Sequence, residues 1–174
     1  MKKVLLLHGW GGSDFPHWQS WLACELVKNY RTVSFLKLSN YDFPDLGMWK
    51  QELKEHLEDF RPDIVICHSL ANILWFHLCL EDAMADVEKL YLVAPPRLDC
   101  EIEELKTFFP VSVPKDLHAK EILLITSTND PYLSAKEANE LQTLLNVPMK
   151  VILNGGHINT DSGFGEWNWM LESL

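Results

Sequence analysis

Serine, aspartate and histidine, in that chain order, each follow a short apolar run of this sequence. They are Ser69 in "ICHSLA", Asp130 in "TSTNDPY" and His157 in "NGGHIN". A serine hydroxyl is a weak nucleophile until a base accepts its proton, and a fixed anion must orient that base. The set therefore predicts nucleophilic catalysis, with Ser69 attacking, His157 acting as general base and then acid, and Asp130 holding the imidazolium.

Each of the three residues also has a purely structural interpretation. Ser69 stands where a serine commonly caps a helix that follows a strand, and Asn-Asp-Pro at Asp130 is an ordinary turn signal. Asp99 and Asp161 are rival acids, of which Asp99 also follows an apolar run, although we favour Asp130. A lone histidine such as His157 is usually structural. Taken singly, none of these residues decides between structure and catalysis.

The residues beside Ser69 depart from the usual spelling of a catalytic turn. In α/β-hydrolases the nucleophile lies on a tight strand-to-helix turn written G-x-S-x-G, whereas Cys67 and Ala71 occupy the glycine positions here. Glycine avoids clashes with the adjacent strand and helix, and cysteine and alanine are the next-smallest choices. The sequence thus keeps a small residue on each side of the serine, which predicts a strained nucleophile at the turn.

The loop "HGWGG" at residues 8–12 can supply what acyl transfer needs besides a nucleophile. A developing oxyanion requires two backbone N–H donors, one from the residue after the serine and one from the loop after the first strand. We therefore predict Leu70 N–H and Trp10 N–H as donors, with Gly11 as the second choice in the loop. A dinucleotide-binding loop is disfavoured, because the spacing is not G-x-G-x-x-G and no acidic residue ends the second apolar run.

Further residues near the ends of apolar runs are candidates for the wall of a substrate pocket: His8, Gly11, His68, Phe108, Phe109 and Phe164. The seven histidines also raise the question of a metal site. No H-E-x-x-H motif, paired Cys/His spacing or series of carboxylates supports one, so neither a metal nor another cofactor is expected.

Six short apolar runs indicate the strands that position these residues: Val4–Leu7, Thr32–Leu38, Ile64–Cys67, Leu90–Val93, Ile122–Thr126 and Lys150–Leu153. Helical patterns alternate with them, at His17–Asn29, Leu46–Phe60, Leu70–Ala85, Glu101–Phe109, Ser134–Leu145 and Gly165–Leu174, with N-caps at Asp45 and Ser134. Such alternation predicts a three-layer α/β domain with about six parallel strands in a doubly wound sheet. Ligands bind at the carboxyl ends of such strands, so the three catalytic candidates and the 8–12 loop should meet at one edge.

The composition is typical of one soluble domain spanning residues 1–174. The 25 acidic and 15 basic residues give a net charge of −10 without a basic cluster, which disfavours nucleic acids and anionic membranes as partners. No apolar run reaches the ~18 residues of a membrane span, and "VLLL" is too short for a signal peptide. The four cysteines form no C-x-x-C pair, so reduced thiols and a cytoplasmic location are expected. Residues 95–120, which hold four of the nine prolines, are a candidate small cap.

Longer motifs resemble those of the small serine hydrolases related to retinoblastoma-binding protein nine. They are "HGWGGSDFPHWQSWL", the proline at 44 with the tryptophan at 49, "CHSLA", "TSTNDPY" and "GGHINTDSGFGEW", and they extend over essentially the whole chain. The resemblance implies an α/β-hydrolase fold without the two leading strands and with a minimal lid. It also implies a triad of Ser69, Asp130 and His157. Ala71 and Cys67 depart from the family, which usually has glycine in this turn.

These observations favour a serine hydrolase that cleaves a small ester or amide through an acyl-enzyme intermediate. Two other interpretations stay open. One is a hydrolase-fold module that binds a protein partner through its acidic surface or its proline-rich segment, with catalysis vestigial or secondary. The other is acyl transfer or lyase chemistry on the same triad. Neither the substrate nor the acyl-chain preference follows from the sequence.

Overall fold

The computed structural model describes residues 2–81 and 84–174 of the chain. Its strands are β1 (Lys3–Leu7), β2 (Thr32–Leu36), β3 (Ile64–His68), β4 (Val87–Val93), β5 (Ala119–Ser127) and β6 (Met149–Ile152). They form one sheet in the order β2-β1-β3-β4-β5-β6, and every neighbouring pair is parallel. The predicted six-stranded parallel sheet is therefore confirmed.

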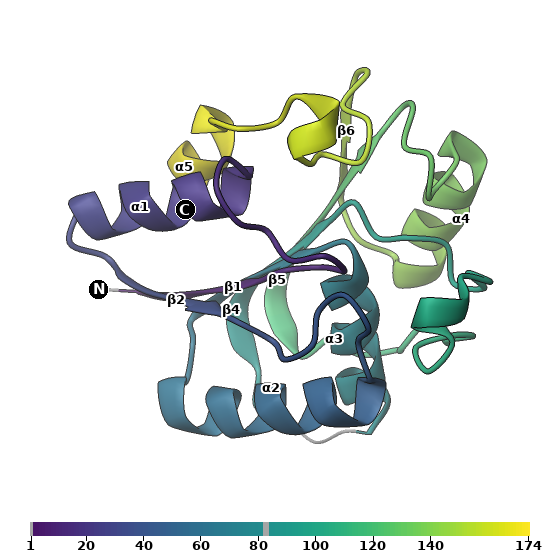
Figure 1. Cartoon of the computed structure of the whole chain (residues 1–174), viewed down its shortest axis with the longest axis horizontal. Coiled ribbons are helices and arrows are strands. Elements are labelled where there is room, and N and C mark those ends of the chain that lie inside the picture. Colours follow the sequence, from purple (N-terminus) through teal and green to yellow (C-terminus); the bar gives the residue numbers. More distant parts are fainter. Residues whose placement is uncertain (1, 82–83) are drawn as a thin grey trace.

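Helices cover both faces of this sheet (Figure 1). They are α1 (Trp18–Lys28), α2 (Leu46–Phe60), α3 (Leu70–Leu80), α4 (Ala135–Leu145) and α5 (Asn168–Glu172). Buried residues of α1 and α5 belong to one core cluster, and those of α2, α3 and α4 belong to the other. Two apolar cores on either side of a sheet make the predicted three-layer α/β architecture.

The strands are apolar on both faces because both faces are covered. All five residues of β3 are buried, as are four of the five residues of β1. Neighbouring side chains of a strand point to opposite faces, so alternate residues enter different cores. Val65 of β3 belongs to the α2–α3–α4 side and Ile66 belongs to the α1–α5 side. The continuous apolar runs in the sequence thus reflect burial on two sides.

Capping residues begin the helices at the predicted positions. The Asp45 carboxylate accepts a hydrogen bond from Met48 N–H (2.9 Å) at the start of α2. Ser134 and Glu137 form a complete capping box at the start of α4. Helix α4 follows the loop that carries Asp130, so this cap fixes where that loop ends.

Two predicted helices differ from the structure. In Glu101–Phe109 only one 3₁₀ turn forms, at Glu103–Leu105. The residue before a proline is disfavoured in a helix, and Phe109 precedes Pro110. Helix α3 ends at Leu80 rather than Ala85, and residues 82–83 of that prediction lie outside the described residues.

The segment from residue 95 to residue 120 lies on the α2–α3–α4 side of the sheet. Leu105, Phe108, Val111 and Leu117 from this segment are buried in that core. These four buried side chains anchor the segment to the core on this side of the sheet.

The chain order creates a switch point between β1 and β3. From β1 the chain crosses over α1 to β2 on one side, and β3 then pairs with the other side of β1. Loops leaving adjacent strands in opposite directions open a crevice where ligands bind in such sheets. None of the helices in the described part of the chain has both the length and the apolar character that crossing a bilayer requires.

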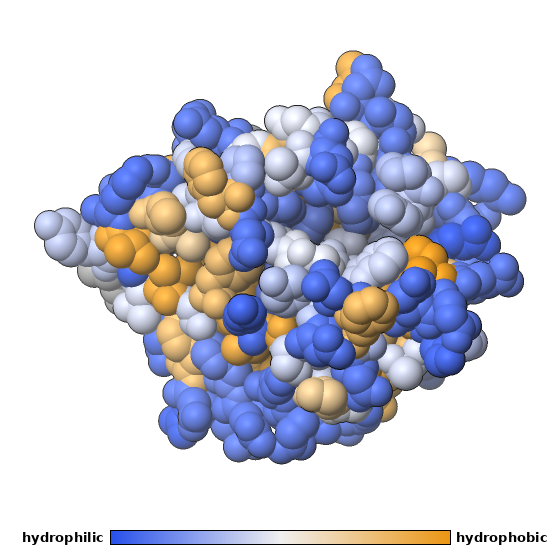
Figure 2. All heavy atoms as spheres, viewed as in Figure 1, coloured by the Kyte–Doolittle hydropathy of each residue, from blue (hydrophilic) through white to orange (hydrophobic). Residues whose placement is uncertain are grey.

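The surface seen from the same direction is mostly hydrophilic (Figure 2). Hydrophobic side chains on this face gather mainly on the side of α1 and β2.

Candidate active site

Ser69 occupies the sharp turn from β3 into α3. Its backbone is at φ 54° and ψ −122°, a positive φ that a residue with a side chain rarely adopts. The serine stands at the N-cap position of α3, but its side chain makes no capping hydrogen bond. Cys67 and Ala71 occupy the two glycine positions of the G-x-S-x-G motif, and both are fully buried. The turn is thus built with small buried neighbours, and the serine hydroxyl is available for another partner.

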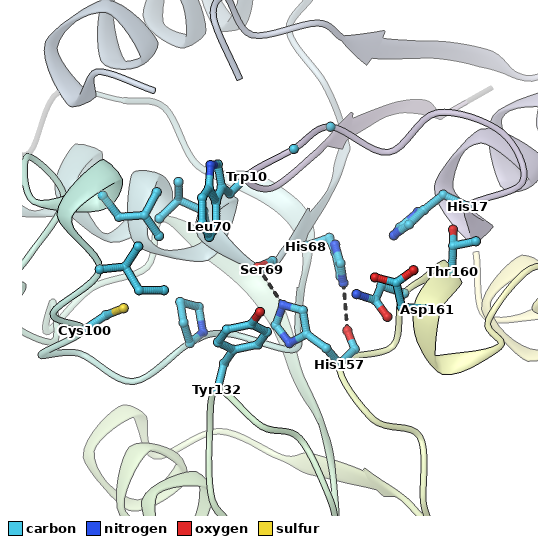
Figure 3. A pocket seen from close by; sticks show the side chains of 16 residues that line it. Trp10, His17, His68, Ser69, Leu70, Cys100, Tyr132, His157, Thr160 and Asp161 are labelled. Carbon is cyan, nitrogen blue, oxygen red and sulfur yellow. Dashed lines mark hydrogen bonds between the residues drawn. The ribbon is translucent and has the colours of Figure 1, made fainter. Parts of the chain in front are cut away.

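A continuous hydrogen-bonded chain joins Ser69 to His157 and Asp130, and Figure 3 shows its bond between Ser69 and His157. His157 Nε2 lies 2.7 Å from Ser69 Oγ. His157 Nδ1 lies 3.0 Å and 2.9 Å from the two carboxylate oxygens of Asp130. Asp130 and His157 are both buried, so water has little access to compete for these bonds. The arrangement can pass a proton from the serine hydroxyl to the imidazole.

The loops after β5 and β6 are tied together around this chain. Asn129 Oδ1 accepts hydrogen bonds from Ser127 Oγ (2.9 Å) and from Gly156 N–H (2.7 Å). Ser162 Oγ accepts from His157 N–H at 3.0 Å. Gly156 has φ 55°, and a Cβ atom there would meet Ser162 Oγ at 2.3 Å. The glycine therefore allows the loop to close on Ser162, which holds the backbone of His157.

Asn72, which no pattern in the sequence singled out, holds the serine turn through hydrogen bonds. Its Nδ2 group donates to the carbonyl oxygens of Ser69 (2.8 Å) and Val93 (2.9 Å), and Ser69 N–H donates to the same Val93 oxygen (3.0 Å). The side chain is fully buried. The available signal was a lone amide in the apolar helix sequence "LANILWF", because buried polar groups require partners.

The loop after β1 passes directly over Ser69. A Cβ atom on Gly9 would lie 2.7 Å from Ser69 Cβ, so only glycine permits this approach. Gly11 N–H donates to Tyr41 O (3.0 Å). In the part of the chain that the structure describes, Trp10 N–H and Leu70 N–H donate to no protein acceptor. The geometry thus favours Trp10 over Gly11 as the loop donor.

His8, His17 and His68 are also buried, and burial disfavours their charged forms. Burial lowers the pKa of His17 to about 4, with the nearby His157 as a second cause. Burial also lowers the pKa of His8 and moves that of His68 well below its usual range. Hydrogen bonds fix the neutral form of His8, since Nδ1 donates to Gly9 O (2.8 Å) while Nε2 accepts from Leu38 N–H (2.9 Å). His157 differs from these three because its Nε2 atom contacts Ser69 Oγ.

The predicted pocket residues fall into two groups. A pocket of about 320 Å³ opens over Ser69, and Gly11 and His68 line it, as do Trp10 and Leu70. His8, Phe108, Phe109 and Phe164 are not among its lining residues. Phe108 is fully buried against Trp49, with ring centroids 5.3 Å apart, and Phe164 packs on Trp167 at 5.5 Å. Phe108 therefore lies in one core, and the half-buried Phe164 packs against the other.

Around Ser69 the pocket wall combines residues that the sequence singled out with residues that it did not. On one side of Ser69 lie mainly apolar residues, and on the other lie mainly polar ones (Figure 3). Figure 3 labels Trp10, Leu70, Cys100 and Tyr132 on the first side, and His17, Thr160 and Asp161 on the second. The lining residues also include Pro96, Ile102, Leu105 and Asn159. Four of the apolar residues belong to the irregular 95–120 segment, whose path no periodicity in the sequence reveals.

The two rival acids lie elsewhere than beside His157 Nδ1. Asp99 pairs with Arg97 on the surface, and Arg97 Nε donates to Asp99 Oδ1 at 2.8 Å. Asp161 lines the pocket but makes no hydrogen bond to the histidine. Among the described residues, no group of three or more histidine, cysteine, aspartate or glutamate side chains could hold a metal ion.

Known proteins share the sequence pattern and the fold of this chain. A family model described as serine hydrolase matches residues 4–174. The structure of the ydeN gene product from B. subtilis has a TM-score of 0.88 at 22% identity, covering 100% of this chain and 97% of that one. A YdeN-like hydrolase from Pectobacterium atrosepticum has a TM-score of 0.72 at 24% identity, with 99% and 89% covered. Est1E from Butyrivibrio proteoclasticus has a TM-score of 0.67 at 13% identity, with 99% and 84% covered. No curated protein sequence matches significantly.

Proposed function

The chain belongs to the serine hydrolase family, and from this premise we propose that it cleaves a carboxylic ester or amide through an acyl-enzyme intermediate. Ser69 is the nucleophile, His157 the general base and then acid, and Asp130 the carboxylate that orients the imidazole. The observation that carries the proposal is the unbroken hydrogen-bonded chain from Asp130 through His157 to the serine at the strained turn.

In the first half of the reaction Ser69 Oγ attacks the substrate carbonyl carbon while its proton moves to His157 Nε2. The Asp130 carboxylate accepts a hydrogen bond from Nδ1–H, which selects the tautomer with a free Nε2 lone pair and stabilises the imidazolium that forms. Collapse of the tetrahedral intermediate expels the leaving group, to which His157 returns the proton. Water then repeats these steps on the acyl-enzyme, releasing the acid and restoring Ser69.

The negative charge on the tetrahedral oxygen needs donors that are already in place. Leu70 N–H and Trp10 N–H fit this role, since neither donates to a protein acceptor in the described residues and both belong to the pocket wall. Removing one such donor typically lowers kcat by roughly 100- to 1000-fold. The α3 N-terminus beside Leu70 adds the favourable end of a helix dipole.

A fluorophosphonate probe tests the proposal directly. The probe should label the folded wild-type protein on Ser69, identified by the mass of the modified peptide. Labelling should vanish in Ser69→Ala and fall strongly in His157→Ala, because the hydroxyl is then no longer activated. Thr143→Ala is a matched control, because this exposed hydroxyl lies outside the pocket wall and donates to Asn139 O of the same helix, α4. Unlabelled wild-type protein with a folded spectrum would contradict the proposal.

We also propose that, within the serine hydrolase family, the chain belongs to a narrower group of small hydrolases. The motifs "HGWGGSDFPHWQSWL" and "GGHINTDSGFGEW" support placing the chain with the small hydrolases related to retinoblastoma-binding protein nine. The ester or amide class rests on the triad geometry. Acyl transfer would use the same intermediate, and product analysis with an added acceptor alcohol distinguishes transfer from hydrolysis.

A further inference from the structure

Among the described residues that line the pocket, Asp161 is the only aspartate, glutamate, lysine or arginine. The other fifteen lining residues include no lysine, arginine, aspartate or glutamate. Its carboxylate lies on the same side of the pocket as His17 and Thr160 (Figure 3). Among the described residues no lysine or arginine pairs with it.

The surroundings of Asp161 do not neutralise this charge. His17 Nδ1 accepts a hydrogen bond from Gln19 N–H (3.2 Å), which requires an unprotonated nitrogen. Burial also keeps the pKa values of His17 and His68 low. Asn159 uses its Oδ1 atom for Ser162, accepting from N–H at 3.0 Å and from Oγ at 2.8 Å. One side of the pocket therefore carries a negative charge that no lysine or arginine among the described residues pairs with.

Asp161 lies on the side of the pocket that suits the leaving group of the substrate. The leaving group must stay within reach of His157 Nε2, because that atom returns the proton to it. Asp161 follows His157 by four residues in the same loop, on the polar side of the pocket, whereas the opposite side is mainly apolar. The apolar side suits an acyl chain, and the polar side suits the alcohol or amine that leaves.

We propose that Asp161 gives this hydrolase a preference for esters whose leaving group carries a positive charge, such as an amino alcohol or a quaternary ammonium alcohol. The inference rests on the proposed serine hydrolase function and names the substrate class of the same site. A cationic group near Asp161 gains Coulomb energy and is attracted before binding, and salt weakens both effects.

Acetylcholine and its uncharged carbon isostere 3,3-dimethylbutyl acetate make a matched pair of probes. They share the acetyl group and the shape of the leaving group and differ in one charge. We expect a higher kcat/KM for the cationic ester, after each value is divided by the rate of that ester with hydroxide. An ion pair at a partly exposed site makes the preference about threefold to fivefold at low salt, and smaller in 0.5 M salt.

Variants at Asp161 separate this charge effect from other causes. Asp161→Asn should bring the normalised ratio close to one, and Asp161→Lys should invert it, because the pocket charge changes sign. Glu166→Gln removes a carboxylate from an exposed position that does not line the pocket, and it should keep the wild-type ratio. Circular dichroism checks that each variant is folded.

The outcomes distinguish the two proposals. If the wild type hydrolyses the neutral ester with a normalised ratio near one, or if Asp161→Lys leaves the ratio unchanged, the role of Asp161 is wrong and the hydrolase function stands. If neither ester is cleaved and Ser69 does not react with the fluorophosphonate, the proposed function itself fails.

Discussion

At Gly9 the backbone of the loop after β1 passes so close to Ser69 that a side chain would not fit between them. An added Cβ would lie 2.7 Å from Ser69 Cβ and 3.1 Å from His68 O, and neither atom belongs to a flexible side chain. Gly9→Ala should therefore push the loop that carries Trp10 N–H away from Ser69. Misplacing a catalytic group by about 1 Å can cost on the order of 100-fold, so we expect kcat for a neutral ester to fall by roughly that factor.

Gly165→Ala is the matched control for this prediction. The nearest atom to an added Cβ there is Pro16 O at 3.4 Å, an ordinary contact, so kcat should change little. Thermal unfolding of both variants separates lost catalysis from lost stability. Wild-type kcat in folded Gly9→Ala would show that the loop does not provide the oxyanion donor.

At the residue scale, the sequence predicted the three members of the hydrogen-bonded chain but not their supports. Ser69, Asp130 and His157 were identifiable because each follows an apolar run, and strand ends meet at one edge of a parallel sheet. Asn72 and Ser162 act through contacts with residues distant in the sequence or on folded loops. Such contacts arise only once the loops have a conformation, which local patterns do not contain.

At the scale of elements, Asn72 joins the start of α3 to the end of β4. Asn72→Leu keeps the branched shape of the side chain but removes both of its donations, which leaves Ser69 O with the donor Asn72 N–H and Val93 O with the donor Ser69 N–H. A lost hydrogen bond typically costs about 0.5–1.5 kcal/mol, and a loss in that range is expected in the free energy of unfolding by urea. The turn should also hold Ser69 less firmly, so kcat should fall while KM changes less. Normal kcat in Asn72→Leu would assign this residue to stability alone.

His17 is the N-cap of helix α1, and its titration should make stability depend on pH. Burial lowers the pKa of His17 from the ordinary histidine value of 6.5 to about 4 in the folded chain. Between these values the unfolded chain binds more protons, so the free energy of unfolding falls as pH decreases from about 6.5 to about 4. The full effect is on the order of 3 kcal/mol for this histidine.

His17→Asn tests this assignment while keeping an N-cap. The asparagine Oδ1 atom can accept from Gln19 N–H as His17 Nδ1 does, but it does not titrate. Urea unfolding at pH 7 and at pH 4.5 should show a smaller loss of stability in the variant than in the wild type. The pKa values of His8 and His68 are also lowered, so part of the dependence should persist. An identical loss in both proteins would exclude His17 as a source.

Elements differed in how well the sequence predicted them. The strands and the long helices were predicted because burial on two sides gives continuous apolar runs, and amphipathic helices give a regular period. The Glu101–Phe109 helix was wrong because Leu105 and Phe108 are spaced like a helical face yet reach the core from one 3₁₀ turn and the turn that follows. Apolar spacing alone does not reveal how the backbone runs between two anchored side chains.

At the scale of the whole molecule, the switch point of the sheet and the 95–120 segment together define the pocket. Loops after β1 and β3 supply Trp10, Ser69 and Leu70 to its wall. The segment after β4 supplies the apolar wall at Pro96, Cys100, Ile102 and Leu105. The fold thus fixes the position of the nucleophile, whereas the size of the acyl chain depends on an irregular segment.

Cys100→Phe tests whether this segment limits the acyl chain. Cys100 is partly exposed on the apolar side of the pocket, and a phenyl ring there should occupy space that a longer chain needs. Across p-nitrophenyl esters from acetate to octanoate, kcat/KM should fall by about fourfold for each methylene group that loses its contact, following about 0.8 kcal/mol per buried methylene. The acetate ester should react at nearly the wild-type rate. Cys24→Phe, on the exposed surface of α1, should leave the whole series unchanged. An equal reduction for all chain lengths would mean that the new ring disturbs Ser69, whereas an unchanged series would place the acyl chain on the polar side, where Asp161 lies.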